Sequence, residues 1–201
     1  DVYKRQIDKL NKENGGDYGV TIVQPLAGGL VDKLNAQDGR YSLYLRGLLK
    51  GEKVEETRIV DCVTRGINPY TNTDEFFDCA KNPDLRFIVS NTTEAGIEYK
   101  PNQNPDDFNG LTFPGRLTLF MKKRFDEGLG GFILLPCELI DKNGDNLKEC
   151  ILKYSVDWGY GDEFEKWIET ENHFTNTLVD RIVTGYPRDN AKEMEQSYGY
   201  L

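Results

Sequence analysis

The chain has 201 residues, of which 38% are hydrophobic and 29% charged, and its formal net charge is −9. This composition is that of a globular protein, and the length supports one α/β domain with a full core. The negative charge disfavours nucleic acid as a partner because it repels phosphate. No apolar run reaches the roughly 18 residues that a membrane helix needs, and no secretory leader is evident. We therefore expect a cytoplasmic protein without a membrane partner.

The cysteines and the histidine limit the chemistry that this chain can perform. Four cysteines stand at positions 62, 79, 137 and 150, without a CxxC pair or a neighbouring histidine. Metal sites and disulfide frameworks favour tighter, paired spacing, so we expect reduced, mostly buried thiols and no metal. The single histidine, His173, also disfavours a Ser-His-Asp triad.

In the first half of the chain, the hydrophobic pattern predicts a helix, a strand and a hairpin. Residues 1–6 carry no capping signal, and we interpret them in part as a non-native remnant. In chain order, the predicted elements are a short helix from Ile7 that residues 14–16 break, a strand over 19–24 that Pro25 ends, a loop over 26–39, and a hairpin with strands over 41–47 and 52–60 joined at 50–51.

In the second half, strand and helix signals alternate. The predicted elements are a helix over 76–80 capped by residues 73–75, a strand over 85–90, a helix over 114–125, a strand over 131–136, helices over 146–158 and 162–168, and a strand over 177–184. This rhythm is typical of a parallel sheet with crossover helices. We see no internal repeat or linker, and we predict one α/β domain that is truncated at both ends.

Ligands of open parallel sheets bind at the carboxyl ends of the strands, so the loops there are the candidate sites. The clearest predicted strand leads into the loop 90–96. Its small polar residues would let the backbone approach a ligand, while Asn91 and Thr92 offer hydrogen bonds. Asparagine and threonine also form caps and turns, and the residues alone favour neither interpretation.

The other strand ends are less distinctive. In the loop 136–144, Glu138 beside Cys137 could orient a ligand or move a proton, but the residues favour a helix cap and an Asn143-Gly144 turn. Asp180 and Arg181, between apolar residues, are typical of a structural ion pair. Gln24 can bond a ribose hydroxyl but offers no charge for a 2′-phosphate, which favours NAD over NADP. No GxGxxG motif follows a strand, and Gly28-Gly29 indicates a flexible loop.

Three segments carry a family resemblance. They are SNTTEAGI at 90–97, PCELIDKNG at 136–144 and TLVDRIVTGYPR at 177–188, and Gln37-Asp38-Gly39 and Arg46-Gly47 also fit. Together they resemble the mannitol dehydrogenase family of polyol-specific long-chain dehydrogenases, and within it the tagaturonate reductase type. The resemblance covers the chain from Ile7 onward.

The resemblance implies a Rossmann-type α/β fold, a doubly wound and mostly parallel sheet with a β-hairpin insertion, here lacking its first strand. Residues 7–201 would form part of the NAD-binding domain, and the helical substrate domain would be absent. Members of this family transfer hydride between NAD and a sugar alcohol or sugar acid without a metal. Their general acid/base, a lysine, would lie beyond Leu201, and their Gly-rich turn before Ile7.

The loops and the resemblance together give the expected site. Supporting catalytic roles are expected for Glu94 and Glu138, cofactor binding for Gln24, Ser90, Asn91, Thr92 and Asp180, and substrate binding for Cys137, Asn143 and Arg181. We expect NAD as the cofactor, a sugar acid as the small-molecule substrate, and hydride transfer between tagaturonate and altronate as the reaction.

Other functions stay open at this point. One is that of fructuronate reductase or another polyol dehydrogenase of the family. Mannitol and fructuronate enzymes tend to carry Asp-Asn where Glu138-Leu139 stand, and Leu139 cannot take that asparagine's part in holding the substrate oxyanion. A non-enzymatic alternative is an inactive binding module of the same fold. The downstream sequence, with or without the lysine segment, would distinguish these.

Overall fold

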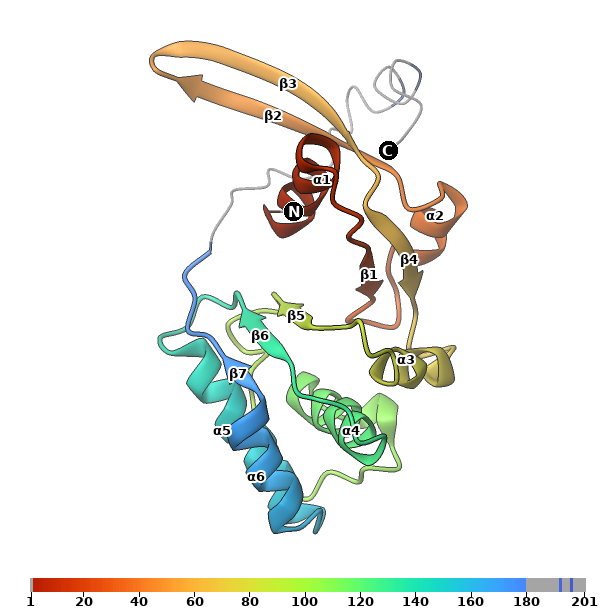
Figure 1. The fold of residues 1–201 in the computed structure, drawn as a ribbon, viewed down its shortest axis with the longest axis vertical. Helices are drawn as coiled ribbons and strands as arrows, with labels where there is room; N and C mark the ends of the chain where they lie inside the picture. The colour runs from red at the N-terminus through yellow and green to blue at the C-terminus, as the bar shows by residue number, and fades with distance from the viewer. Residues whose placement is uncertain (1, 180–191, 193–195, 197–201) are drawn as a thin grey trace. The chain divides into compact units, whose positions relative to one another are not determined.

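The structure is a computed structural model that describes residues 2–179, 192 and 196 (Figure 1). The described residues form two compact units, one within Asp1–Asn68 and one within Pro69–Asp180. Each unit is described by itself below. Among the described helices, none has the length and apolar character required to cross a membrane.

The first unit combines a parallel strand pair with an antiparallel hairpin. Its elements are α1 (Val2–Asn14), β1 (Val20–Val23), α2 (Val31–Ala36), β2 (Tyr41–Leu49), β3 (Glu52–Val60) and β4 (Val63–Ile67). β1 pairs in parallel with β4, and β2 pairs with β3 from Tyr41 opposite Val60 to Leu49 opposite Glu52. Lys50 and Gly51 join the hairpin, and both have positive φ, as a two-residue type I′ turn requires. The predicted hairpin is confirmed, with β2 two residues longer than predicted.

The sequence analysis missed α2 and β4, which the structure packs against each other. The prediction of a loop over residues 26–39 is therefore wrong for Val31–Ala36. Asn35 of α2 bonds both the amide and the carbonyl of Gly66 in β4, at 2.8 and 2.9 Å. A Cβ at Gly66 would lie 2.9 Å from Val31, so the glycine that weakens the strand signal is what allows the helix to approach.

The helix α1 begins at Val2, not at Ile7 as predicted, and it packs on the hairpin. Ile7 lies against a buried cluster of Leu43, Val60 and Cys62. Asp8 is fully buried on the same helix and binds Lys12 at 2.8 Å. Lys12 also donates to the carbonyl of Ile59 at 2.8 Å, so one charged pair joins α1 to the end of β3.

The second unit is a three-stranded parallel sheet with helices along one side (Figure 1). Its elements are α3 (Thr73–Ala80), β5 (Phe87–Ser90), the short 3-10 helix η1 (Phe108–Gly110), α4 (Phe113–Asp126), β6 (Ile133–Pro136), α5 (Asn143–Asp157), α6 (Asp162–Glu171) and β7 (His173–Phe174). The strand order is β5-β6-β7, with Phe87 opposite Ile133 and Ile133 opposite His173. The predicted alternation of parallel strands and helices is confirmed.

Two predicted boundaries in this unit are wrong. Residues 175–179 are not a strand, and the rest of the strand predicted over 177–184 lies outside the described residues. The third strand is instead β7, whose two residues are too few to show alternation. Asn143 and Gly144 are not a turn but the first residues of α5, which follows Lys142 in the left-handed region at φ 51°.

The core of the second unit is aromatic. Phe76 of α3 packs on Phe120 of α4 with ring centroids 4.9 Å apart, and Phe120 stacks on Phe132 at 5.8 Å. Tyr154 and Ile151 of α5 are fully buried, as are Phe164 and Ile168 of α6. Arg124 is also buried there, and its guanidinium lies 4.7 Å from the centroid of the Phe132 ring.

The long connection from β5 to α4 is held by the carboxyl-terminal part of α5. The buried Tyr154 hydroxyl donates to Gln103 at 2.5 Å and accepts from the Lys100 amide at 3.0 Å. Trp158 donates to the carbonyl of Gln103 at 2.8 Å, and Thr112 lies 2.8 Å from the same hydroxyl. These bonds explain how a connection of this length can be ordered without a strand or long helix of its own.

Candidate functional site

A buried carboxylate, that of Glu138, joins the carboxyl ends of β5 and β6. Glu138 is 1% exposed and follows β6. One carboxylate oxygen accepts the Ser90 hydroxyl at 3.1 Å, and the other accepts both the amide and the hydroxyl of Thr92, at 3.0 and 2.9 Å. The amide of Cys137 donates to the Ser90 carbonyl at 2.8 Å. Two loops predicted to carry the site are thus brought together.

The inward bonds decide which groups of the loop 90–96 remain available. The Ser90 and Thr92 hydroxyls are directed to Glu138, so in this arrangement they support the loop. Asn91, between them, is exposed, and its side chain makes no hydrogen bond within the described part of the chain. Its amide is therefore the free donor and acceptor at this strand end.

The rest of this loop is a tight turn. The Gly96 amide donates to the Thr93 carbonyl at 2.8 Å, and a Cβ at Gly96 would lie 1.8 Å from the Thr92 hydroxyl oxygen. The turn therefore needs glycine at this position. Glu94 is exposed on the turn. Its predicted role in orienting substrate or relaying a proton stays a prediction, as does the supporting catalytic role of Glu138.

Asn143 connects the loop after β6 to the segment after β7. It is 1% exposed, and its side-chain nitrogen donates to the carbonyls of Pro136, Glu138 and Thr177 at 3.0, 3.0 and 2.9 Å. Its side-chain oxygen accepts the amides of Gly144 and Thr177, at 2.9 and 3.0 Å. The sequence analysis interpreted Asn143-Gly144 as a turn and missed these anchoring bonds.

The start of α5 is not open to an anion. The Gly144 amide is bonded to Asn143 and the Asp145 amide to the side chain of Asn176 at 3.1 Å. Helix amino termini bind phosphate through free amides, and these two are occupied. Cys137 is buried and its thiol lies 3.4 Å from the Leu135 carbonyl. Its predicted contact with substrate stays a prediction.

Gln24 follows β1 in the first unit and is 5% exposed. Its side-chain nitrogen donates to the carbonyls of Leu26 and Ala27 at 2.8 and 3.1 Å, and its oxygen accepts the Val31 amide at 3.3 Å. The side chain thus shapes the loop that leads into α2. Binding a ribose would require it to exchange some of these bonds, and the predicted role stays a prediction. Asp180 and Arg181 lie outside the described residues.

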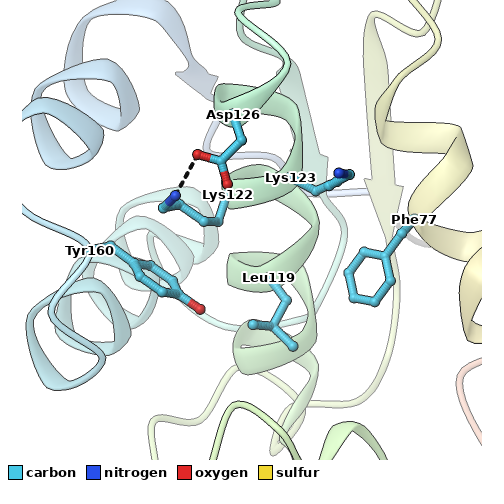
Figure 2. A pocket seen from close by; sticks show the side chains of 6 residues that line it. All are labelled: Phe77, Leu119, Lys122, Lys123, Asp126 and Tyr160. Atoms are coloured by element: carbon cyan, nitrogen blue, oxygen red, sulfur yellow. Dashed lines mark hydrogen bonds and ion pairs between the residues drawn. The ribbon is translucent and has the colours of Figure 1, made fainter.

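A separate hollow of about 200 Å³ lies on the surface of α4 (Figure 2). Phe77 and Leu119 form its apolar part, and the Tyr160 ring borders it from the other side. Lys122 is paired with Asp126 at 2.5 Å and Lys123 with Glu127 at 3.0 Å, so its cations are already neutralised. Burial, with smaller effects of Asp126 and Asp106, raises the pKa of Tyr160 to about 12. Nothing in this set of side chains indicates a catalytic group.

Comparison with known proteins agrees with the fold. Residues 4–198 match the family described as the mannitol dehydrogenase Rossmann domain. In structure, the chain is similar to Pseudomonas fluorescens mannitol 2-dehydrogenase in a ternary complex with NAD and D-mannitol, with a TM-score of 0.82, 19% identity, and coverage of 98% of this chain and 42% of that one. D-sorbitol dehydrogenase in substrate-free form gives a TM-score of 0.77 at 20% identity, over 99% of this chain and 43% of that one.

These findings define a Rossmann-type α/β protein and confirm the predicted fold class. The chain belongs to the mannitol dehydrogenase family, through its Rossmann domain. It is 44% identical over 200 residues to the altronate oxidoreductases of Cronobacter sakazakii and Shigella sonnei. These alignments cover 97% of this chain but only 41% and 42% of the two relatives, so the chain spans less than half of their length.

Proposed function

We propose that the full-length protein containing this chain is an NAD-dependent oxidoreductase that interconverts tagaturonate and altronate. The observation that carries the proposal is the 44% identity to altronate oxidoreductases over 97% of the chain. The loops that carried the resemblance, 90–97 and 136–144, also meet in one buried hydrogen-bonded arrangement at the strand ends, where ligands of parallel sheets bind.

The residues at these strand ends fit the nicotinamide half of NAD. The turn at Gly96 leaves no room for a side chain beside Thr92, so the packing of this loop requires a glycine there. The exposed Asn91 amide can bond ribose hydroxyls or a carboxamide. In the loop after β1, residues 25–30 carry no positive charge, which supports NAD rather than NADP. The first amides of α5 are already hydrogen-bonded within the protein, so this helix start does not bind the pyrophosphate of NAD.

The roles of the residues follow from their positions. When bound, NADH supplies the hydride. Glu138 fixes the main chain around Asn91 through Ser90 and Thr92, and Asn91 orients the nicotinamide ribose. Glu94, exposed on the same turn, is placed to exchange protons with solvent. The principal general acid/base is the lysine that the family resemblance implies outside this chain.

The alternatives differ in substrate or in activity. Fructuronate reduction is favoured by no residue of the described loops, since Leu139 stands where an asparagine is expected and is 49% exposed. To separate the alternatives, the purified full-length protein would be assayed with NADH and either tagaturonate or fructuronate. Faster oxidation with tagaturonate supports the proposal, faster oxidation with fructuronate selects the sibling reaction, and no oxidation with either selects the inactive module.

Replacing Asn91 by alanine tests the site directly. Losing one or two neutral hydrogen bonds to bound ligand should lower kcat/KM about 2- to 100-fold. The melting temperature of the apoprotein should hardly change because Asn91 bonds no other described residue. Thr93→Ala, an exposed neighbour in the same loop, is the matched control and should stay within about twofold. A lower melting temperature with unchanged kinetics would instead make Asn91 a structural cap.

A further inference from the structure

Two buried side chains connect the carboxyl ends of all three strands in the second unit. Glu138 reaches from the end of β6 to Ser90 and Thr92 after β5, through its carboxylate. Asn143 reaches from the start of α5 to the Glu138 carbonyl and to Thr177 after β7. The main chain of Glu138 is therefore held by Asn143, and the side chain of Glu138 holds the loop 90–96.

The amide of Asn143 has no capacity left for a ligand. Its two N–H groups serve three carbonyl oxygens, and its oxygen accepts two amides. It is also 1% exposed. A substrate could bond this side chain only by displacing bonds within the protein. This argues against the contact with substrate that the sequence suggested.

The same junction is closely packed on its other side. A Cβ at Gly144 would lie 2.5 Å from the Thr175 carbonyl oxygen, so the start of α5 touches the main chain after β7. The Thr177 hydroxyl also donates to the Pro136 carbonyl, and the Asn176 side chain accepts the Asp145 amide. Close packing of this kind passes a displacement of one segment to the next.

We propose that Asn143 is a positioning residue that sets the geometry of the loop 90–96 through Glu138, without touching substrate or cofactor. The inference rests on the proposed dehydrogenase function for its kinetic consequences. The structural claim, that Asn143 fixes the loop 90–96 through Glu138, does not depend on that function. Loss of the Asn143 donor frees the Glu138 carbonyl, and the Thr92 amide then loses a fixed acceptor.

The test uses Asn143→Asp in the full-length protein, with Asn146→Asp as the matched control. The aspartate keeps the shape but places an acceptor against the carbonyls of Pro136, Glu138 and Thr177. Asn146 is on the same helix, is exposed, and donates only to the Asp141 carbonyl. The same chemical change is thereby made three residues further on, outside the junction.

Hydrogen exchange of the apoprotein is the first measurement. In Asn143→Asp, the Thr92 amide should exchange about 2- to 100-fold faster than in the wild type, and in Asn146→Asp it should not change. If protection at Thr92 is the same in both variants, Asn143 does not position the loop. This readout needs neither cofactor nor substrate, so it stands even if the protein turns over no hexuronate.

Ligand binding separates positioning from direct contact. NADH titration should give a Kd about 2- to 100-fold higher for Asn143→Asp, and combining it with Thr92→Val should cost less than the sum of the single changes. A raised KM for tagaturonate with unchanged NADH Kd and unchanged Thr92 exchange would show a substrate ligand and overturn the proposal. If Asn143→Asp fails to fold, Asn143→Ser, which is smaller and keeps one donor, takes its place with the same expected outcomes.

Discussion

Arg124 places a positive charge in the interior of the second unit, and no carboxylate of the described residues forms an ion pair with it. It is 3% exposed, and its guanidinium donates to four main-chain carbonyl oxygens, those of Ala80, Asn82, Leu85 and Gly130. The burial lowers the pKa of Arg124, but guanidinium groups remain protonated in proteins. A guanidinium group has five N–H donors in one plane. A single side chain can therefore hydrogen-bond main-chain carbonyl groups at the end of α3 and in the segments that precede β5 and β6.

Arg124→Met should be among the most destabilising single changes in this unit. Methionine fills a similar volume but leaves the four carbonyls without their donor, which should cost about 3–5 kcal/mol of unfolding free energy. Urea unfolding followed by circular dichroism measures the loss. Arg86→Met removes an exposed arginine that lies over the Phe87 ring and should stay within about 0.5–1 kcal/mol. Equal losses of unfolding free energy in both variants would show that the four hydrogen bonds of Arg124 do not stabilise this unit.

At the residue scale, the sequence placed the candidate loops at strand ends but could not predict the bonds between them. The strand-end rule placed Ser90, Asn91, Thr92 and Glu138 in candidate loops, and the structure joins those loops. It could not show that the Ser90 and Thr92 hydroxyls point inward, since this depends on Glu138, more than 40 residues away. Asn143 was hidden for the same reason: a local Asn-Gly pattern indicates a turn, while its bonds are to distant main chain.

Among the elements, α1 is attached to the hairpin by a charged pair as well as by apolar packing. Burial alone would raise the pKa of Asp8, but the Lys12 ammonium and the Asp61 amide outweigh it and leave that pKa lowered. The partners also raise the pKa of Lys12, against the opposing effect of burial. Both directions favour the charged forms near neutral pH.

The lowered pKa of Asp8 makes the docking of α1 sensitive to acid. A carboxyl whose pKa is depressed on folding stabilises the fold above its unfolded pKa, and this contribution is lost as pH falls through the folded value. We expect the difference in unfolding free energy between wild type and Asp8→Asn to shrink by about 1 kcal/mol between roughly pH 6 and pH 3. Urea titrations at several pH values measure it. A difference that does not vary with pH would mean that the pair is not linked to folding.

How far an element could be predicted depends on where its signal lies. The hairpin has period-two alternation and a two-residue turn within one continuous stretch, so its two strands and its turn could be predicted from the sequence. β4 contains Gly66 next to its last residue and owes its strand form to pairing with β1 and packing of α2, which are distant in the chain. β7 owes its strand form to the bonds that the His173 and Thr175 amides make to the backbone of Phe132 and Leu134, about 40 residues earlier in the chain.

For the whole molecule, the family match covers the Rossmann domain, while the chain spans about 41% of its curated altronate oxidoreductase relatives. We expect the 201-residue chain, purified alone, to show no tagaturonate-dependent oxidation of NADH. The reason is that the family resemblance implies a lysine of the helical substrate domain as the general acid/base. The full-length protein is the positive control. Measurable turnover by the 201-residue chain would show that one of its own residues acts as the general acid/base.

The bonds between α5 and the connection from β5 to α4 can form only late during protein synthesis. The partners of Lys100, Gln103 and Tyr99 on α5 follow them by 54, 51 and 58 residues. At about 5–20 residues per second, a ribosome needs roughly 3 to 12 s to add that much chain. During this interval the connection has left the ribosome or is leaving it, and none of these three bonds can form. During each round of translation the connection therefore lacks these three bonds until Tyr154 and Asp157 have been added to the chain.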